Sequence, residues 1–427
     1  MGWNLAELIQ RHKVPGAQVA VLANGEIEDH AAGLLSLHTR IETTPDSVFQ
    51  IGSITKIWTA TLAQKLVNER VLDLDCPIRS YLPEFELSDP VATESATARH
   101  LLTHTNGIDG NLFTDTGQDD GAIARFVATL STAEQLFLPG AMFSYCNTGY
   151  AVLGRLIEVL RGKPFHDVLR SGLVTPLGLN TVSTNAYEAI LHRAAVGHDQ
   201  GAPVRTWALA YSNSPGGAQL AMSARDLLTF VRLHLTDEFA VLREPQVTVP
   251  PNLGVPRWGL GWMLLGDGVV GHTGTTLGQK AFLRVVPEAG VAVAVLTNSL
   301  GGPGLAHEVF THTLRELAGV ETPPRVTPPA NPAPLDDTMF GTYRGTKVDY
   351  VLTNEDGRAF LSYVPRDALG AEFIGEHRRD EVVRLDDTSI ITLEPDFGTH
   401  YVATFVGRDS EGRPKWLHNT NACYRIA

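Results

Sequence analysis

Short hydrophobic runs joined by tight turns occur in two widely separated stretches of the chain, a pattern that predicts β-strands. Residues 17–33 divide into two such runs around Asn24-Gly25, a dipeptide that favours the tight type I′ turn of a hairpin. Residues 281–286 and 291–297 form a second such pair around a turn that contains proline and glycine. We expect the two hairpins to join one antiparallel sheet.

The sequence between the hairpins has a different period. Apolar residues recur at helical spacing in residues 54–69, 151–160 and 224–235, and again after the second hairpin in residues 305–317. These patterns predict an α/β fold in which helices flank the antiparallel sheet and an α-helical region is inserted between its strands.

The composition changes after the last of these helices. Residues 321–335 hold six prolines, which predicts a semi-rigid extended linker. Residues 336–427 show short alternating runs separated by Gly, Asp and Asn, a pattern typical of a small antiparallel barrel or sandwich. We therefore expect a first domain at residues 1–320, the linker, and a second domain at residues 336–427.

Composition and charge narrow the classes of function. The chain has 43% hydrophobic and 19% charged residues, an ordinary globular balance, and its net charge of -13 disfavours nucleic acid as a partner. Three cysteines without CxxC spacing predict neither a disulfide framework nor a thiolate metal site. The N-terminus lacks the features of a signal peptide, and no apolar run is long enough for a membrane span, so we expect a cytoplasmic protein without a membrane partner.

Candidate chemistry begins with Ser53-Ile54-Thr55-Lys56, at the predicted start of a helix. Residues three apart share a helix face, so Lys56 lies one turn from Ser53. A serine hydroxyl needs a neighbour that takes its proton, and a lysine can do so when burial and the helix N-terminus disfavour its charged form. In isolation the motif also fits a serine N-cap beside a surface lysine.

Tyr145-Cys146-Asn147 is the second candidate element. A tyrosine beside a cationic lysine can have a depressed pKa and serve as a base, and the Asn147 side chain can hold both Lys56 and a substrate amide. Taken alone, Tyr145 is more simply explained as a tyrosine packed in the core.

The third element, His272-Thr273-Gly274-Thr275, lies next to the second hairpin, where we expect an edge of the sheet. Small residues at a strand edge let a substrate backbone approach closely. The backbone N–H of Thr275 can pair with that of Ser53 as an oxyanion hole. A structural role for the histidine is the alternative.

The order SxxK, YxN, HTG resembles the penicillin-binding-protein and class C β-lactamase superfamily, as do connecting segments such as residues 101–108, LLTHTNGI. The resemblance covers residues from about 5 to 318 and implies a β-lactamase/transpeptidase-like sheet with the site beside the α-helical region. It implies that Ser53 is the nucleophile, that Lys56 and Tyr145 transfer protons, that Asn147 positions substrate and lysine, and that His272, Thr273 and Gly274 form the third motif. No metal or cofactor is expected: His100 and His104 have zinc-like spacing but no third ligand.

The departure from the family lies at His272. Typical class C β-lactamases have lysine there, which helps to bind the substrate carboxylate, so efficient β-lactam hydrolysis is not expected.

The C-terminal residues resemble the lipocalin-like barrel of D-stereospecific peptidases and peptide-cyclising thioesterases. In the latter an arginine near the end of the barrel reaches the acyl site, which makes Arg425 a candidate for binding a peptide carboxylate. Asn213 is a weaker candidate for substrate contact.

Three functions are compatible with these motifs. The leading hypothesis is an acyl-enzyme that releases and cyclises a peptide presented as a thioester, either free or on a carrier protein. The second is a hydrolase with the same acyl-enzyme, acting as a D-stereospecific peptidase, amidase, esterase or β-lactamase. A β-lactam-binding receptor without turnover belongs to another class, and the intact Ser53, Lys56 and Tyr145 disfavour it.

Overall fold

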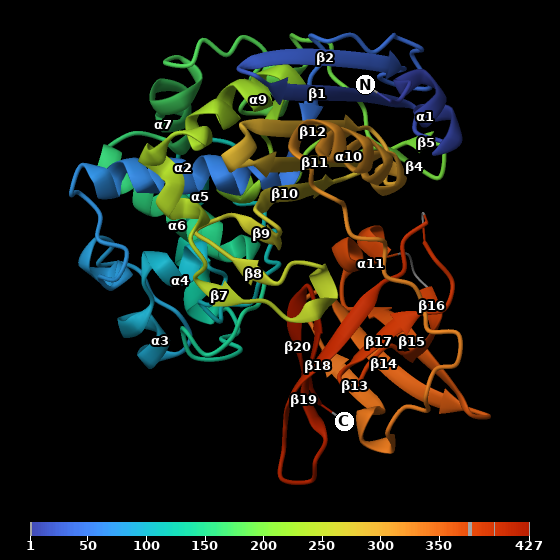
Figure 1. Ribbon diagram of the computed structural model, residues 1–427. Coiled ribbons are helices and arrows are strands. Elements are labelled where there is room, and N and C mark those ends of the chain that lie inside the picture. The colour runs from blue at the N-terminus through green and yellow to red at the C-terminus, as the bar shows by residue number, and fades with distance from the viewer. Residues whose placement is uncertain (1, 375–377, 397, 427) are drawn as a thin grey trace.

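An antiparallel sheet of eight strands organises the larger part of the structure, a computed structural model that describes residues 2–374, 378–396 and 398–426. The strands, in spatial order, are β2 (Glu26–Gly33), β1 (Gly16–Ala23), β12 (Val291–Thr297), β11 (Gln279–Val286), β10 (Val269–Thr276), β9 (Met263–Gly266), β8 (Arg257–Trp258) and β7 (Val247–Thr248). Because β1 pairs with β12, the two predicted hairpins share one sheet, and that prediction is confirmed (Figure 1).

The two faces of this sheet are covered by different helices. On β1, Val19 and Val21 pack on one face beneath α1 (Leu5–Arg11) and α10 (Gly302–Ala318), and Ala20 and Leu22 belong to the core on the opposite face with α9 (Ala224–Val231). Since successive strand residues point to opposite faces, this alternation follows directly from the sequence.

An α-helical region lies between β2 and α9 in sequence and packs beside the sheet (Figure 1). Its helices are α2 (Thr55–Asn68), α3 (Pro90–Ser95), α4 (Ala98–Leu102), α5 (Ala122–Ala128), α6 (Asn147–Arg161), α7 (Phe165–Leu169) and α8 (Ala186–Ala189). Two small sheets join β3 (Phe49–Gln50) to β6 (Ala221–Met222) and β4 (His198–Asp199) to β5 (Ala202–Pro203).

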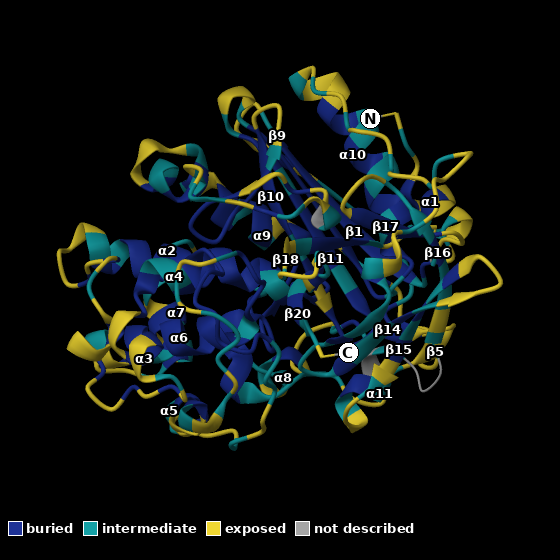
Figure 2. Cartoon of the chain, turned by 90° about the horizontal axis from the view of Figure 1, so that it is seen from below, coloured by how far each residue is buried: buried dark blue, intermediate teal, exposed yellow. Residues whose placement is uncertain are grey.

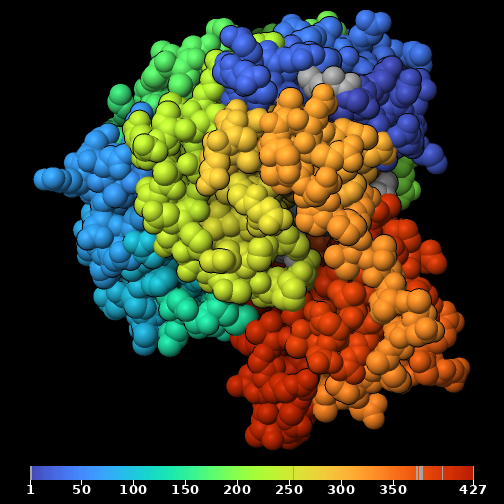
Figure 3. Space-filling view, viewed as in Figure 1, coloured from blue at the N-terminus to red at the C-terminus, as the bar shows by residue number. Residues whose placement is uncertain are grey.

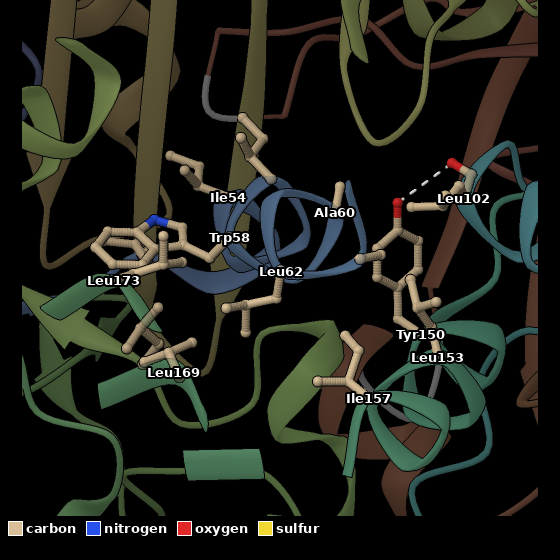
Figure 4. Close-up of a cluster of buried hydrophobic side chains, with 14 of the residues drawn as sticks. Ile54, Trp58, Ala60, Leu62, Leu102, Tyr150, Leu153, Ile157, Leu169 and Leu173 are labelled. Carbon is tan, nitrogen blue, oxygen red and sulfur yellow. Dashed lines mark hydrogen bonds between the residues drawn. The ribbon is translucent and has the colours of Figure 1, made fainter. Parts of the chain in front are cut away.

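Helix α2 is the central helix of this region. Nearly all of its first three turns are buried, because hydrophobic and small residues surround the axis instead of forming one stripe. Figure 4 shows Trp58 on the side of Leu173 and Ala60 on the side of Tyr150. In Figure 2 the buried residues gather along α2, α6 and the sheet. A helix held on all sides keeps its first turn, which contains Lys56, in a fixed position.

The ring stacking of Trp58 on Phe230, with centroids 3.9 Å apart, predicts a large effect of Trp58→Ala. Emptying this fully buried site is expected to destabilise the surrounding helices by about 3–5 kcal/mol. The measurement is the urea midpoint at which enzymatic activity or near-UV circular dichroism is lost. Val91→Ala, at a side chain that is 59% exposed, is the control and should change stability by less than about 0.5 kcal/mol.

A closed antiparallel barrel of eight strands follows near the C-terminus. The alternating runs were compatible with a barrel or a sandwich, and the barrel implied by the resemblance is confirmed. Its strands are β13 (Gly341–Arg344), β14 (Val348–Glu355), β15 (Arg358–Pro365), β16 (Arg378–Arg384), β17 (Ser389–Thr392), β18 (Val402–Arg408), β19 (Pro414–Asn419) and β20 (Asn421–Arg425), and α11 (Ala368–Ile374) lies between β15 and β16. Figure 3 shows the barrel, orange to red, as a lobe against the yellow-green segment that precedes β10.

The proline-rich residues 321–335 contain neither helix nor strand, and the domain boundaries at 320 and 336 stay a prediction. Across the described ranges, no helix combines the length and apolar character that crossing a membrane requires.

Candidate active site

Ser53 lies in the tight turn that leads into α2, formed by Gly52–Ile54. Gly52 adopts a left-handed backbone conformation, with φ of 51°, and a Cβ atom there would lie 2.7 Å from the Thr275 nitrogen. A Cβ atom at Gly274 would lie 3.0 Å from the Ser53 nitrogen. The two glycines therefore let the serine turn and β10 approach each other, as a pair of backbone oxyanion donors requires.

Lys56 is fully buried one turn along, as the SxxK spacing predicts. Its Nζ lies 3.2 Å from Ser53 Oγ, 2.6 Å from Asn147 Oδ1 and 2.6 Å from the Gly216 carbonyl oxygen. Burial lowers the pKa of Lys56 to about 7. A neutral amine can donate to Asn147 and Gly216 and still direct its lone pair at the Ser53 hydroxyl.

This pKa predicts the pH dependence of acylation. Lys56 accepts a proton only when it is neutral, and its neutral fraction rises as the pH passes through a pKa of about 7. We expect kcat/KM for a small activated ester to increase between roughly pH 5.5 and 8.5, with half of the maximum near that pKa. A profile that stays flat across this range would contradict the assignment of Lys56 as the base.

Tyr145 faces the same serine, but its ionisation differs from the sequence-based expectation. Burial raises the pKa of Tyr145 above its ordinary value, and the neighbouring Ser53 side chain offsets part of this effect. The same burial that neutralises Lys56 removes the positive charge that would favour a phenolate. Among the described residues, the Tyr145 hydroxyl has no hydrogen-bond partner of normal geometry. The tyrosine is therefore poised as a phenol that donates a proton.

Strand β10 carries the third motif. It was expected at an edge of the sheet but lies between two other strands. It pairs with β11 on one side and, through Gly271, with β9 on the other. Only the part from His272 onward is unpaired on the β9 side among the described strands, and it is this part that runs beside the Ser53 turn. Thr273 and Thr275 line the cleft, whereas Gly274 faces the backbone of Ile51 and Ser53.

His272 points away from the cleft, because alternate residues of a strand face opposite sides. It is fully buried, with its ring centroid 5.4 Å from that of Trp258 and 6.4 Å from that of Tyr145. Burial, reinforced by the nearby Lys56, lowers the pKa of His272 to about 3. Its Nδ1 lies 2.6 Å from the Thr273 carbonyl oxygen, so the neutral ring carries its proton on Nδ1. The position thus presents no cation to a substrate.

Asn147 reaches Lys56, but the structure does not bring Asn213 and Arg425 to Ser53. The Asn213 side chain is buried and donates to the Leu112 carbonyl oxygen at 3.1 Å. The Arg425 guanidinium donates to the carbonyl oxygens of Thr338 and Phe340 at 2.9 and 2.5 Å. Arg425 also lines a separate depression of the barrel. The expectation that Arg425 extends into the acyl site is not met, because backbone acceptors within the barrel already hold its guanidinium.

The barrel nevertheless contributes to the cleft through other residues. Ser53 and the barrel residues Lys347, Tyr350 and Asn421 line one cavity of about 430 Å³. Lys347 brings a cation to this wall and pairs with Asp367 at 2.6 Å. These barrel residues were missed in the sequence, since no local motif marks a residue whose role depends on contact with a distant segment.

The β19–β20 hairpin connects the barrel to the segment that carries Tyr145. It runs along residues 143–145, where the Tyr145 N–H donates to the Thr420 carbonyl oxygen at 3.1 Å and the Ala422 N–H donates to Ser144 Oγ at 3.0 Å. His418 contacts the Phe143 carbonyl oxygen at 3.0 Å. The segment that carries Tyr145 is therefore held partly by the barrel.

The histidine pair considered for zinc is engaged in local structure. His104 is buried, accepts a hydrogen bond from the Cys146 N–H at 3.0 Å, and packs its ring 4.2 Å from that of Tyr145. His100 forms a capping box with Thr97 at the start of α4. Cys146 is likewise buried, and burial raises the pKa of its thiol to about 12, as expected for a packed side chain.

Comparisons with known proteins cover both parts of the chain. The family model described as Beta-lactamase matches residues 4–317. Penicillin-binding protein 4 of Amycolatopsis lactamdurans is 38% identical over 356 residues, which span 78% of this chain and 93% of that protein. The crystal structure of SurE is 28% identical with a TM-score of 0.77, over 98% of this chain and 97% of that chain. A class C beta lactamase from Rhodobacter sphaeroides is 25% identical with a TM-score of 0.58, over 72% and 97%.

Proposed function

The chain belongs to the beta-lactamase family, which includes penicillin-binding-protein-like serine hydrolases, and on this premise we propose that it is a peptide-releasing macrocyclase that works through an acyl ester of Ser53. Its family membership confirms the resemblance inferred from SxxK, YxN and HTG. The proposed substrate is a peptidyl thioester, free or on a carrier protein.

The observation that carries the acyl-transfer proposal is the buried Lys56 amine 3.2 Å from Ser53 Oγ. As Oγ forms its bond to the acyl carbon, the hydroxyl proton passes to the Lys56 amine. The backbone N–H groups of Ser53 and Thr275 stabilise the negative charge on the carbonyl oxygen. When the carbon–sulfur bond breaks, the Tyr145 phenol gives its proton to the leaving sulfur and regains one from the lysine.

The second half-reaction reverses these transfers. The free amine of the bound peptide attacks the ester carbon, an amide bond forms, and the bond to Ser53 Oγ breaks. The amine loses one proton to the Lys56–Tyr145 pair, which returns a proton to Oγ, so the enzyme is regenerated without any cofactor.

Support for a peptide substrate comes from the composite cleft and from the relatives. Both parts of the chain line the cavity that contains Ser53, and the similarity to SurE extends over almost the whole of both chains. The SurE structure has also been determined with D-Leu, which favours a substrate with a D-residue. The uncharged His272 further distinguishes the site from that of typical class C β-lactamases.

Hydrolysis by the same acyl-enzyme is the second candidate. Its specific support is the row of polar side chains along the cleft, including Asn111, Asn147 and Thr275, which can hold an attacking water molecule. In that case the products are linear peptides or acids, as expected for a D-stereospecific peptidase or esterase. A receptor without turnover is disfavoured, because the lysine base lies within hydrogen-bonding distance of the nucleophile.

A peptidyl N-acetylcysteamine thioester with a free N-terminal amine and a D-residue at its C-terminus tests the proposal. Mass spectrometry should find the cyclic product, lighter than the linear acid by one water, formed by the wild type and absent with Ser53→Ala. If the linear acid is the sole product, the protein is a hydrolase and not a macrocyclase. Absence of any adduct or product, in a folded protein, would refute acyl transfer itself.

A further inference from the structure

A continuous row of side-chain amides connects the two proton-transfer residues through the barrel. Lys56 Nζ donates to Asn147 Oδ1 at 2.6 Å, and Asn147 Nδ2 donates to Asn111 Oδ1 at 2.9 Å. Asn111 Nδ2 then donates to Asn421 Oδ1 at 2.9 Å, and Asn421 Nδ2 donates to the Tyr145 carbonyl oxygen. The row begins at Lys56, passes through β20 of the barrel, and ends at the backbone of Tyr145.

The two ends determine the direction of every hydrogen bond in this row. The backbone carbonyl of Tyr145 can only accept, so Asn421 must turn its NH₂ group towards it and present Oδ1 to Asn111. The same requirement passes to Asn147, which must present Oδ1 to the Lys56 amine. Hydrogen bonds that run head to tail polarise one another, which strengthens the last acceptor, the one that holds Lys56.

Two backbone features make room for the Asn421 side chain. A Cβ atom at Gly110 would lie 2.8 Å from Asn421 Nδ2 and 2.5 Å from the Tyr145 carbonyl oxygen, so any larger residue would obstruct this contact. Thr420, just before it, has φ of 66°, a conformation unusual for a β-branched residue. Such a conformation persists where surrounding contacts enforce it, and here the Tyr145 N–H holds the Thr420 carbonyl.

We propose that Asn421 is a positioning residue for catalysis: acting through Asn111 and Asn147, it holds the Lys56 amine in line with Ser53. The barrel thereby completes the catalytic machinery and does more than border the substrate. This inference rests on the proposed acyl transfer to Ser53, but not on whether an amine or water resolves the ester.

A role in docking alone makes a different prediction. The hairpin keeps other contacts with the α/β part of the chain, among them Ala422 with Ser144 and His418 with Phe143. Removing the Asn421 amide therefore leaves the barrel attached. If Asn421 serves docking alone, its loss should not change a reaction that needs no contact between substrate and barrel.

The test uses the full-length protein and p-nitrophenyl acetate, whose acyl group is too small to require the barrel. Asn421→Asp keeps the shape and the acceptor for Asn111 but loses the donor to Tyr145. We expect kcat/KM to fall by about tenfold or more, because a small displacement of a catalytic group is enough for such a loss. We also expect the acidic limb of the pH profile to move to higher pH, because the pKa of Lys56 should rise. Both greater hydration of the lysine and the new carboxylate nearby favour its charged form.

Asn354→Asp is the matched control. Asn354 lies near the end of β14, and its Oδ1 accepts from the N–H of Gly357 in the following turn at 3.0 Å, a role that aspartate retains. The control should leave both kcat/KM and the pH profile at their wild-type values. Rates are referred to the number of reactive Ser53 groups, counted by the p-nitrophenol burst, so that a partly unfolded variant is not mistaken for a slow one.

A double-mutant cycle with Asn111→Ala decides whether the effect travels along the row. Asn421→Ala should lower kcat/KM by about tenfold in the wild-type background and by less than about twofold when Asn111 is already alanine. Unchanged kinetics and pH profile in the Asn421 variants, or losses that multiply in the double variant, would overturn the proposal. A wild type that p-nitrophenyl acetate does not acylate would instead refute the proposed function.

Discussion

Ser53→Ala is expected to abolish both turnover and covalent labelling by a fluorophosphonate. Ser53 Oγ is the atom that forms the ester. Without it, the lysine, the phenol and the oxyanion donors have no nucleophile to assist. Loss of the nucleophile in a serine enzyme typically lowers kcat by about four to six orders of magnitude. Intact-mass spectrometry should show one adduct on the wild type and none on the variant.

The control for this experiment is Ser131→Ala. Ser131 is half-buried in the turn after α5 and donates to the carbonyl oxygen of Ala128, outside the cleft. This variant should label at the wild-type rate. If the folded Ser53→Ala protein is labelled as fast as the wild type, the nucleophile is another residue and the proposed mechanism is wrong.

Lys56→Met and Tyr145→Phe are expected to have the next largest effects. Methionine approximates the length of lysine but has no basic group. Phenylalanine in place of Tyr145 removes a hydroxyl that lacks a normal hydrogen bond, so Tyr145→Phe should affect folding little. Loss of general acid–base assistance commonly costs about 10²–10⁴-fold in rate. Because the two groups pass the same proton, the double variant should be little slower than the slower single variant.

Tyr150→Phe provides a matched comparison. Its ring centroid lies 5.3 Å from Lys56 Nζ, close to the 4.8 Å of Tyr145, but its hydroxyl donates to the Leu102 carbonyl oxygen and not towards Ser53. Acylation rates measured under single-turnover conditions should change little in this variant. Full acylation activity in Tyr145→Phe, or strictly multiplicative losses in the double variant, would show that the proton follows another path.

The local features of this site were predictable from the sequence for a simple reason. Ser53 and Lys56 are three residues apart at the start of a helix, so helix geometry alone places them on one face. The hydrophobic runs of β1 and β12 and their tight turns are likewise local features, and they predict the two hairpins that share the sheet. The motif order was sufficient to identify the family.

Ionisation at the site depends on burial, which no local pattern reveals. The fold buries both proton-transfer residues. Burial lowers the pKa of Lys56, as a lysine that acts as a base requires, but it raises the pKa of Tyr145, for which the sequence favoured a depressed pKa. His272 lies on the buried face of β10, and this strand occupies an inner position of the sheet. From the sequence, the His272 segment was expected at an edge of the sheet.

Contacts between the two ends of the chain were decided only by the tertiary structure. Asn421 meets Tyr145 across 276 positions of sequence, whereas Arg425, four residues further along, is held by the barrel itself. The sequence determined that residues 336–427 form short antiparallel strands, since strand alternation is local, and the resemblance implied that these strands form a barrel. Which barrel residues reach Ser53 depends on how two separately folded surfaces pack together, and that packing is set by shape and hydrogen bonding over both surfaces at once.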